Sequence, residues 1–357
     1  MLRLAVDTTG HGGAGGHSTF RGGRPRHLAR RSPAGCAEAA SSVEERVAVA
    51  SVAEWVAVTS VGGLGPARIL RLLERHGTLD EALALPDDEL MREARLIPRQ
   101  VATLRARLKR VGELEAYVDD LDIDGISIVP IDADGYPPLL RAIDYPPVVL
   151  YVIGDPSLLA MRSVAIVGAR AASDEGMAFA TALGRELSAA GWAVASGLAD
   201  GIDAAAHTGC LEAGGVPVGV LGCGLAAVED EAEALAFDVR SAGALTSEQS
   251  MSQRPSASTN MARNRIIAGL ARATVAVEFG PSGGTLSTVN ATLDTGRPLF
   301  LAPPAVESTT GKELIRDGAR LLRRPDDLAD LLAAAESFDP ATAQRRDRAD
   351  DQLRLFE

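Results

Sequence analysis

The sequence predicts an α/β protein in which a small all-helical domain precedes a mostly parallel, Rossmann-like sheet. Short apolar runs that end in glycine turns alternate with segments of helical periodicity across residues 163–224. Strands and helices that alternate in this way form right-handed βαβ units, and hence parallel sheets. The core is also aliphatic, because only 4% of residues are aromatic while 46% are hydrophobic, which is typical of buried parallel strands.

The length of 357 residues is enough for one large and one smaller folded domain. We expect four segments along the chain. They are a disordered basic Gly/Arg-rich tail over 1–42, a helical helix-hairpin-helix-like (SAM-like) domain over 43–120, a Rossmann-like domain over 121–335, and a charged linker with a terminal QLRLF peptide over 336–357.

The tail contains six arginines against Asp7 and Glu38, and it has too few apolar residues to form a core. It is interpreted as a nucleic-acid arm, a disordered leader or extra codons upstream of the true start. The whole chain carries a net charge of −12, so any anion site must be local.

The cysteines and the hydropathy pattern indicate in which cellular compartment the protein is expected. Cys36, Cys210 and Cys223 have neither the pairing of a disulfide framework nor the spacing of a zinc site. The sequence has no signal peptide and no apolar run of about 18 residues. We therefore expect a soluble cytoplasmic protein with no metal site and no membrane contact.

In the helical domain, Pro66 follows the glycines of residues 62–65 and marks the start of a helix. The pattern is typical of a helix-hairpin-helix, which either offers its turn amides to a DNA phosphate or serves only for packing. Further helices are expected over 78–84, 87–94 and 99–119.

The Rossmann-like domain begins with strands over 126–131 and 148–154, which flank proline pairs that forbid a long helix. The first central strand, 164–167, is followed by a helix that Ser173 caps and Gly191 ends. The later strands are expected over 192–195, 216–221, 244–247, 274–279 and 298–302.

The glycine turns after these strands are the candidate ligand sites, because open α/β sheets bind ligands at the carboxyl ends of their strands. The first turn lacks the GxGxxG fingerprint and the chain has no P-loop, so we expect neither a dinucleotide cofactor nor an ATPase. Residues 280–284, GPSGG, match a nucleophile elbow, but no histidine follows Ser282 to complete a triad.

Small residues from Ser282 onward instead suggest an anion nest at a helix start. His207 lies on the helix after the Ser196–Gly197 turn, where it is either catalytic or a structural histidine that forms a hydrogen bond near the sheet edge. Arg263, Asn264 and Arg265 precede an apolar run, and arginine side chains suit phosphate oxygens.

Taken together, the ordered segments resemble the DNA-processing protein A (DprA, also called Smf) family from about residue 45 to 332. The matching motifs are YP at 136–137, VAIVGAR at 164–170, SGLADGID at 196–203, RNRIIAGL at 263–270 and SGGTL at 282–286. The resemblance implies an extended Rossmann fold, homodimerisation, binding of single-stranded DNA and loading of RecA recombinase in natural transformation, without catalysis or a cofactor. The DNA-binding residues it implies are Arg170, Ser196, Gly197, Arg263, Asn264, Arg265, Ser282, Gly283 and Gly284.

The chain departs from the family pattern at several positions. Ala169 stands where the family usually has serine, and Asp200 stands where it usually has arginine. An acidic residue facing a phosphate replaces attraction with repulsion. The usual motifs are also absent from residues 225–230, 260–261 and 303–304, so the chain is interpreted as a divergent paralogue.

Two further resemblances are weaker. The fold is similar to that of the LOG-type nucleotide phosphoribohydrolases, which makes a nucleotide-binding protein or hydrolase the alternative function. The residues after Thr285 are Leu286, Ser287 and Thr288, so the catalytic glutamate of that family is missing. The terminal peptide is similar to the clamp-binding peptides of bacterial replication and repair proteins, with Gln352, Leu353, Leu355 and Phe356 as the contacts; the other interpretation is a frayed terminal helix.

Overall fold

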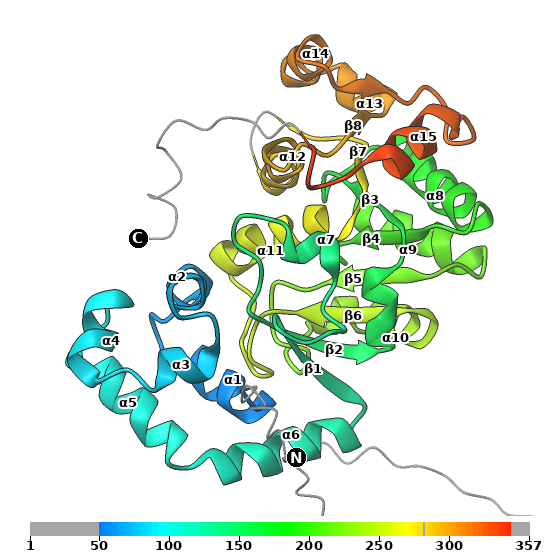
Figure 1. The fold of residues 1–357 in the computed structure, drawn as a ribbon. Coiled ribbons are helices and arrows are strands. Elements are labelled where there is room, and N and C mark those ends of the chain that lie inside the picture. Colours follow the sequence, from blue (N-terminus) through cyan, green and yellow to red (C-terminus); the bar gives the residue numbers. More distant parts are fainter. Residues whose placement is uncertain (1–49, 281–282, 344–357) are drawn as a thin grey trace, which may run out of the picture. The chain divides into compact units, whose positions relative to one another are not determined.

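The computed structural model describes residues 50–280 and 283–343 (Figure 1). The chain begins its described part with a run of helices. These are α1 (Val52–Thr59), α2 (Pro66–His76), α3 (Leu79–Leu83), α4 (Asp87–Glu93), α5 (Pro98–Leu108) and α6 (Val111–Ile123). The expected tail over 1–42 lies outside the described residues, and so does the expected linker and terminal peptide over 336–357 from residue 344 onward.

Local sequence accounts for the helix boundaries in this region. Ser51 and Glu54 form a reciprocal capping box at the start of α1, and Pro66 occupies the first turn of α2 directly after Gly65. The single helix expected over 99–119 is wrong, because Arg110 leaves the helical conformation (φ −110°, ψ 25°) and separates α5 from α6. Its Nε donates to Glu113 Oε1 at 2.9 Å, which stabilises the start of the second helix.

After these helices, the strands of the described residues form one nine-stranded sheet in the order β1-β2-β6-β5-β4-β3-β7-β8-β9. The strands are β1 (Ile126–Pro130), β2 (Val149–Gly154), β3 (Ser163–Val167), β4 (Ala193–Ser196), β5 (Pro217–Val220), β6 (Ala244–Ser247), β7 (Ala273–Ala276), β8 (Leu299–Leu301) and β9 (Arg320–Leu321). All pairs from β6 to β9 are parallel, whereas β2 pairs with β6 and β1 with β2 in antiparallel fashion. The mostly parallel α/β fold is therefore confirmed.

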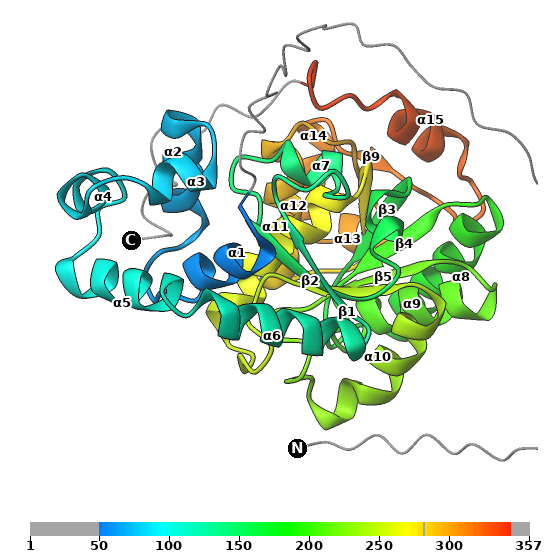
Figure 2. The same ribbon diagram turned by 60° about the horizontal axis from the view of Figure 1, so that its bottom comes forward.

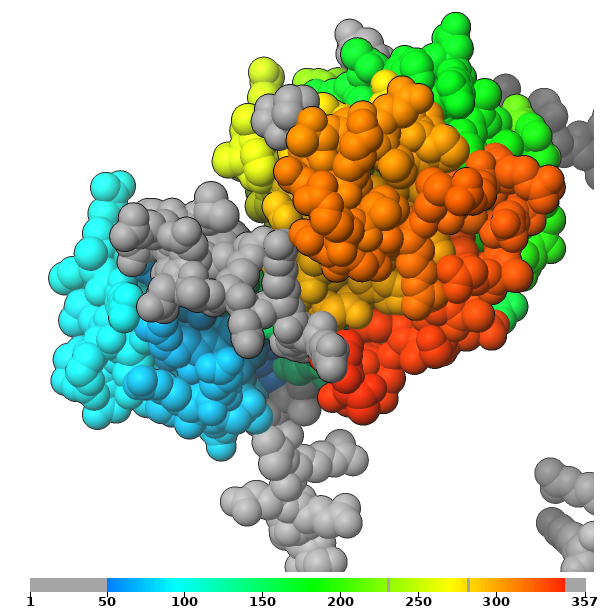
Figure 3. Space-filling model, turned by 90° about the horizontal axis from the view of Figure 1, so that it is seen from above, coloured from blue at the N-terminus to red at the C-terminus, as the bar shows by residue number. Residues whose placement is uncertain are grey.

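The strand β9 is absent from the prediction. It is two residues long, and both Arg320 and Leu321 are exposed, so it carries no apolar run that a sequence pattern could reveal. The helices α13 (Pro303–Val306) and α14 (Thr309–Arg316) precede it in the chain, and α15 (Ala329–Ser337) follows it. In the view of Figure 3 these C-terminal elements form the orange and red surface.

Alternate side chains of β3 point to opposite faces of the sheet and enter separate clusters of buried residues. Val164 and Ile166 pack with α8 (Asp174–Ala189) and α9 (Ile202–Glu212), while Ala165 and Val167 face the side of α11 (Ala257–Leu270). Figures 1 and 2 show the two helical layers, with α8, α9 and α10 (Asp230–Ala242) on one face and α11 and α12 (Gly284–Asp294) on the other.

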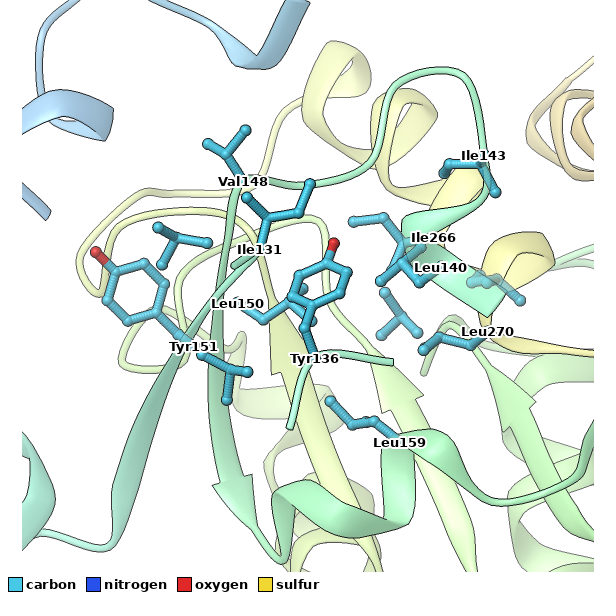
Figure 4. Packing of buried hydrophobic residues seen from close by; sticks show 14 of the residues in the cluster. Ile131, Tyr136, Leu140, Ile143, Val148, Leu150, Tyr151, Leu159, Ile266 and Leu270 are labelled. Atoms are coloured by element: carbon cyan, nitrogen blue, oxygen red, sulfur yellow. The ribbon is translucent and has the colours of Figure 1, made fainter. Parts of the chain in front are cut away.

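The segment between β1 and β2 holds α11 in place, as Figure 4 shows. Leu140 in the short helix α7 (Pro138–Arg141) and Ile143 are buried against α11, which contributes Ile266 and Leu270. Tyr136 is 1% exposed, and its hydroxyl donates to the Pro147 carbonyl at 2.6 Å. This packing matters for function because α11 carries the predicted Arg263 and Asn264.

The described chain contains two buried tryptophans, one in the helical part and one at the start of a central strand. Trp55 in α1 is fully buried, and its Nε1 donates to Asp132 Oδ2 at 3.2 Å. Trp192 precedes β4 and is 2% exposed, with the Arg162 guanidinium stacked 5.2 Å from its ring centre. None of the described helices is both long and apolar enough to cross a bilayer.

Glycines allow α8 and α9 to approach closely. A Cβ on Gly209 would meet the Thr181 Cα at 2.9 Å, and one on Gly184 would meet the backbone N of Cys210 at 3.1 Å. In contrast, the nearest atom to a Cβ on Gly112 in α6 is a glutamate oxygen 3.9 Å away.

We expect Gly209→Ala to destabilise the protein by about 1–3 kcal/mol, because two packed backbones must separate. Gly112→Ala is the matched control and should instead stabilise by about 0.5–1 kcal/mol, because alanine favours the helix and nothing obstructs it. Urea denaturation midpoints of the two variants check this, and equal shifts would contradict the close packing of α8 and α9.

Candidate nucleic-acid interface

The pocket of interest lies where the strand order reverses. From β3 the chain proceeds through β4, β5 and β6 on one side, and β7 and β8 lie on the other. Such a switch point opens a crevice at the carboxyl ends of the strands. A pocket of about 650 Å³ occupies this place, which we call the main pocket.

The walls of the main pocket come from four segments. They are the loop after β3 at residues 168–170, the start and one face of α11 from Ser256 to Asn264, the turn after β4 with the start of α9, and the start of α12 at Gly283 and Gly284. The first helical turns of α11 and α12 therefore both border it. A helix N-terminus attracts anions through its unsatisfied amides and its dipole.

Arg263 forms the floor of the main pocket. It is 6% exposed, and its Nη1 donates to the Gly197 carbonyl at 2.6 Å and also to the Val220 carbonyl. It thus joins the ends of β4 and β5. Burial lowers the pKa of its guanidinium, while the negative charge of Asp203 acts in the opposite direction.

Asn264 connects α11 to α12. Its Nδ2 donates to the Gly284 carbonyl at 2.9 Å, and its Oδ1 accepts from Arg263 Nε at 3.1 Å. Gly283 is exposed and has φ 128°, in the region that favours glycine. Among the described residues, no side chain caps the start of α12, so its first amides are available to a ligand.

Arg170 is the exposed cation of the main pocket. It follows β3, and its positive charge is close enough to lower the pKa of Arg263. The loop that carries it is held by the neighbouring amide of Ala169, which donates to the Glu278 carbonyl at 2.7 Å. Gly201 is required beside this loop, because a Cβ there would overlap the Arg170 carbonyl carbon at 2.8 Å.

Carboxylates also border this region. Asp203 is buried beside Arg263, and desolvation raises its pKa despite the attraction of that arginine. Asp200 and Glu229 are exposed and line a smaller hollow that adjoins the main pocket. The site therefore combines cationic and anionic groups instead of presenting a uniformly basic groove.

The structure brings together six of the nine predicted DNA-binding residues. Arg170, Arg263, Asn264, Gly283 and Gly284 line the main pocket, and Gly197 lines the smaller hollow. Ser196 is fully buried, with its hydroxyl donating to the Ile166 carbonyl at 2.6 Å. Ser282 lies outside the described residues. That these residues contact DNA stays a prediction.

Arg265 is on a different side of α11 from the main pocket. Its guanidinium forms a bidentate ion pair with Glu248, at 2.7 and 2.6 Å, and its Nε donates to the Tyr145 carbonyl at 2.8 Å. The side chains of this pair are 15% and 11% exposed. The arginine is engaged in holding α11 to the segment before β2.

Several pocket residues escaped the sequence interpretation, among them Glu229, Ser256, Asn260 and Met261. Ser256 had a detectable signal, since it caps α11 by accepting from the Thr259 amide at 3.1 Å. The others lie where the usual family motifs are absent, within residues 225–230 and at 260–261. Among the described residues, no cluster of ligating side chains suits a metal ion.

Residues 127–333 match the model of a family described as DNA recombination-mediator protein A. The chain belongs to this family. Protein Smf of Synechocystis sp. is 30% identical over 309 residues, which cover 84% of this chain and 77% of that relative. The confirmed membership agrees with the motifs at 164–170 and 263–270, which border the main pocket.

Two solved structures of this family resemble the chain. DNA processing protein A from Streptococcus pneumoniae has 27% identity and a TM-score of 0.67, covering 79% of this chain and 98% of that structure. DNA processing protein A from Helicobacter pylori, whose structure is described with a single-stranded DNA binding mode, has 23% identity and a TM-score of 0.53, covering 58% and 95%. At this identity the second likeness shows the fold alone.

His207 lies in α9 beneath the floor of the pocket and lines neither hollow. It is fully buried, burial lowers its pKa to about 4, and its ring nitrogens form no hydrogen bond of normal geometry with a described residue. The Ser196 backbone lies close enough to the imidazole to act against burial and raise its pKa, so the structural role expected for this histidine stays a prediction. A neutral, enclosed imidazole is not placed to contact a ligand.

His207 should make the protein less stable as the pH falls. Its pKa is lower in the folded state than the ordinary 6.5, so between pH 6.5 and about 4 the unfolded chain binds a proton that the folded chain excludes, at a cost of up to roughly 3 kcal/mol. His207→Gln should flatten the unfolding free energy across this range in urea titrations. A slope that stays unchanged in His207→Gln would contradict this role.

Proposed function

We propose that this chain is a non-enzymatic protein that binds single-stranded DNA across the main pocket. One observation carries the proposal: exposed Arg170, the open start of α12 and the buried Arg263 charge converge at the switch point of the sheet. Phosphate contacts by arginine and by helix amides position a strand without reading its sequence. Membership of the family and the DNA-binding description of the Helicobacter pylori relative support it.

The wider role that we propose is protection of incoming DNA and loading of RecA recombinase during natural transformation, by a cytoplasmic homodimer. This proposal comes from the family resemblance. The clamp contact through Gln352, Leu353, Leu355 and Phe356 is also proposed, on the sequence of the terminal peptide alone. A clamp pull-down that retains the wild type but not Phe356→Ala would support that contact, and equal retention would contradict it.

The alternative function is binding or hydrolysis of a small nucleotide. The volume of the main pocket, about 650 Å³, is that of a small-ligand site and suits a free nucleotide as well as one nucleotide of a bound strand. Residues 286–288 at the start of α12 offer no carboxylate for hydrolysis. Filter binding of labelled single strands over a salt series separates the two functions, because only the DNA complex loses affinity steeply with salt. Absence of DNA binding together with saturation by free nucleotide would favour the alternative.

Arg170→Ala should weaken binding of single strands about tenfold and reduce the salt slope by about 0.7, because one phosphate contact is lost. The fold should be unaffected, since the side chain is exposed. Arg185→Ala is the matched control: this exposed arginine pairs with Glu212 on the surface of α8 and α9, away from the pocket. Fluorescence anisotropy at several salt concentrations checks both variants. Unchanged affinity in Arg170→Ala would remove this residue from the interface.

A further inference from the structure

The helical part of the chain presents a basic surface where two of its turns meet. One turn joins α1 to α2, and the other joins α4 to α5. Gln100 Nε2 donates to the Gly62 carbonyl at 2.7 Å. Arg68 Nη1 donates to the Arg95 carbonyl at 3.0 Å, so both turns belong to one surface. We call this surface, which consists of residues 60–71 and 94–100, the arginine face.

The arginine face is positively charged in a chain that is acidic overall. It contains Arg68, Arg71, Arg95 and Arg99 but no aspartate or glutamate, whereas the whole chain has a net charge of −12. Arg95 and Arg99 are exposed, and in the described part of the chain neither guanidinium has an ion pair or a hydrogen bond. Ile97 lies between them in the sequence and is 59% exposed. The surface therefore suits an anion that also has apolar parts.

A hollow of about 290 Å³, which we call the bridging hollow, lies between the arginine face and α11. Gly65 and Pro66 at the start of α2 line it, and so does Ala262 of α11. Figures 1 and 2 both show α2 on the side of α11. Ala262 directly follows Met261, which is 52% exposed and lines the main pocket. A surface route thus runs from the main pocket across α11 to the start of α2.

The bridging hollow places no uncompensated charge on this route. Glu248 and Arg265 are the only charged residues among the described ones that line it. They form the bidentate ion pair described above, so each charge is neutralised by the other. A polyanion that crosses the bridging hollow therefore meets no carboxylate without a partner.

We propose that a single strand bound in the main pocket continues across the bridging hollow to the arginine face, where Arg95 and Arg99 bind its phosphates. Ile97 supplies apolar surface for the sugars and bases between those phosphates. Proteins that hold single strands track the backbone with such cationic surfaces. A strand is favoured over an acidic protein segment, because the main pocket already holds part of it nearby. This inference rests on the proposed function.

The test uses single strands of about 4 and about 30 nucleotides, of which only the longer spans both surfaces. In Arg95→Gly/Arg99→Ala, fluorescence anisotropy should show about tenfold weaker binding of the long strand and a salt slope reduced by about 1.4, because two phosphate contacts are lost. The short strand should bind as it does to the wild type. Glycine is chosen at position 95 because the backbone there has φ 52°, which glycine adopts freely, so the fold is retained.

The matched control is Lys109→Ala/Arg185→Ala. It removes the same charge from two exposed positions, one at the opposite end of α5 and one on α8, outside the arginine face and the hollows. It should change the affinity for the long strand less than about twofold, because it removes no phosphate contact.

The outcomes separate this inference from the function beneath it. Normal binding of the long strand by Arg95→Gly/Arg99→Ala would overturn the second contact and leave the proposed function intact. Equal losses for the short and the long strand would also overturn it, because the effect would then arise at the main pocket. Failure of the wild type to bind either strand would overturn the proposed function itself.

Discussion

The buried guanidinium of Arg263 is the interaction on which the site depends. It donates to carbonyls at the ends of β4 and β5, and it faces Asp203 beneath the pocket. A charge in this position must be paired, because leaving one partner buried alone costs several kcal/mol. The same group therefore fixes the separation of two strands and supplies positive potential to the pocket above them. Structure and anion attraction cannot be varied independently at this position.

Helix α11 carries that charge, and its placement is set from outside the site. Leu140 and Ile143 pack on one part of it, while the Arg265–Glu248 pair and the Asn264 bond to Gly284 hold other parts. Consecutive residues 263–265 thus point to three different partners. The sequence alone presents these residues as one basic patch. In the folded chain they make three separate structural contacts, and Arg263 and Asn264 line the main pocket whereas Arg265 does not.

The sequence predicted most of the fold, because buried parallel strands and capped helices leave strong local signals. Val164, Ser173 and Pro66 have the roles that their patterns indicate. The break at Arg110 and the strand β9 escaped prediction, since neither depends on an apolar pattern. The site was predicted less well. Motif membership identified Arg263 and Arg265 equally, but only the tertiary fold decides which guanidinium faces the pocket, and Glu229 enters it from a loop with no local signal.

The two buried tryptophans give the protein a pair of internal optical probes. Trp55 belongs to the helical part of the chain and Trp192 to the sheet, and the sequence contains two tryptophans in all. Neither lines the main pocket or the smaller hollow beside it, so their emission reports the solvation of the two parts of the chain. Replacing one tryptophan at a time would leave a single fluorescent probe in each variant. The two unfolding curves would then show whether the helices separate from the sheet before global unfolding or together with it.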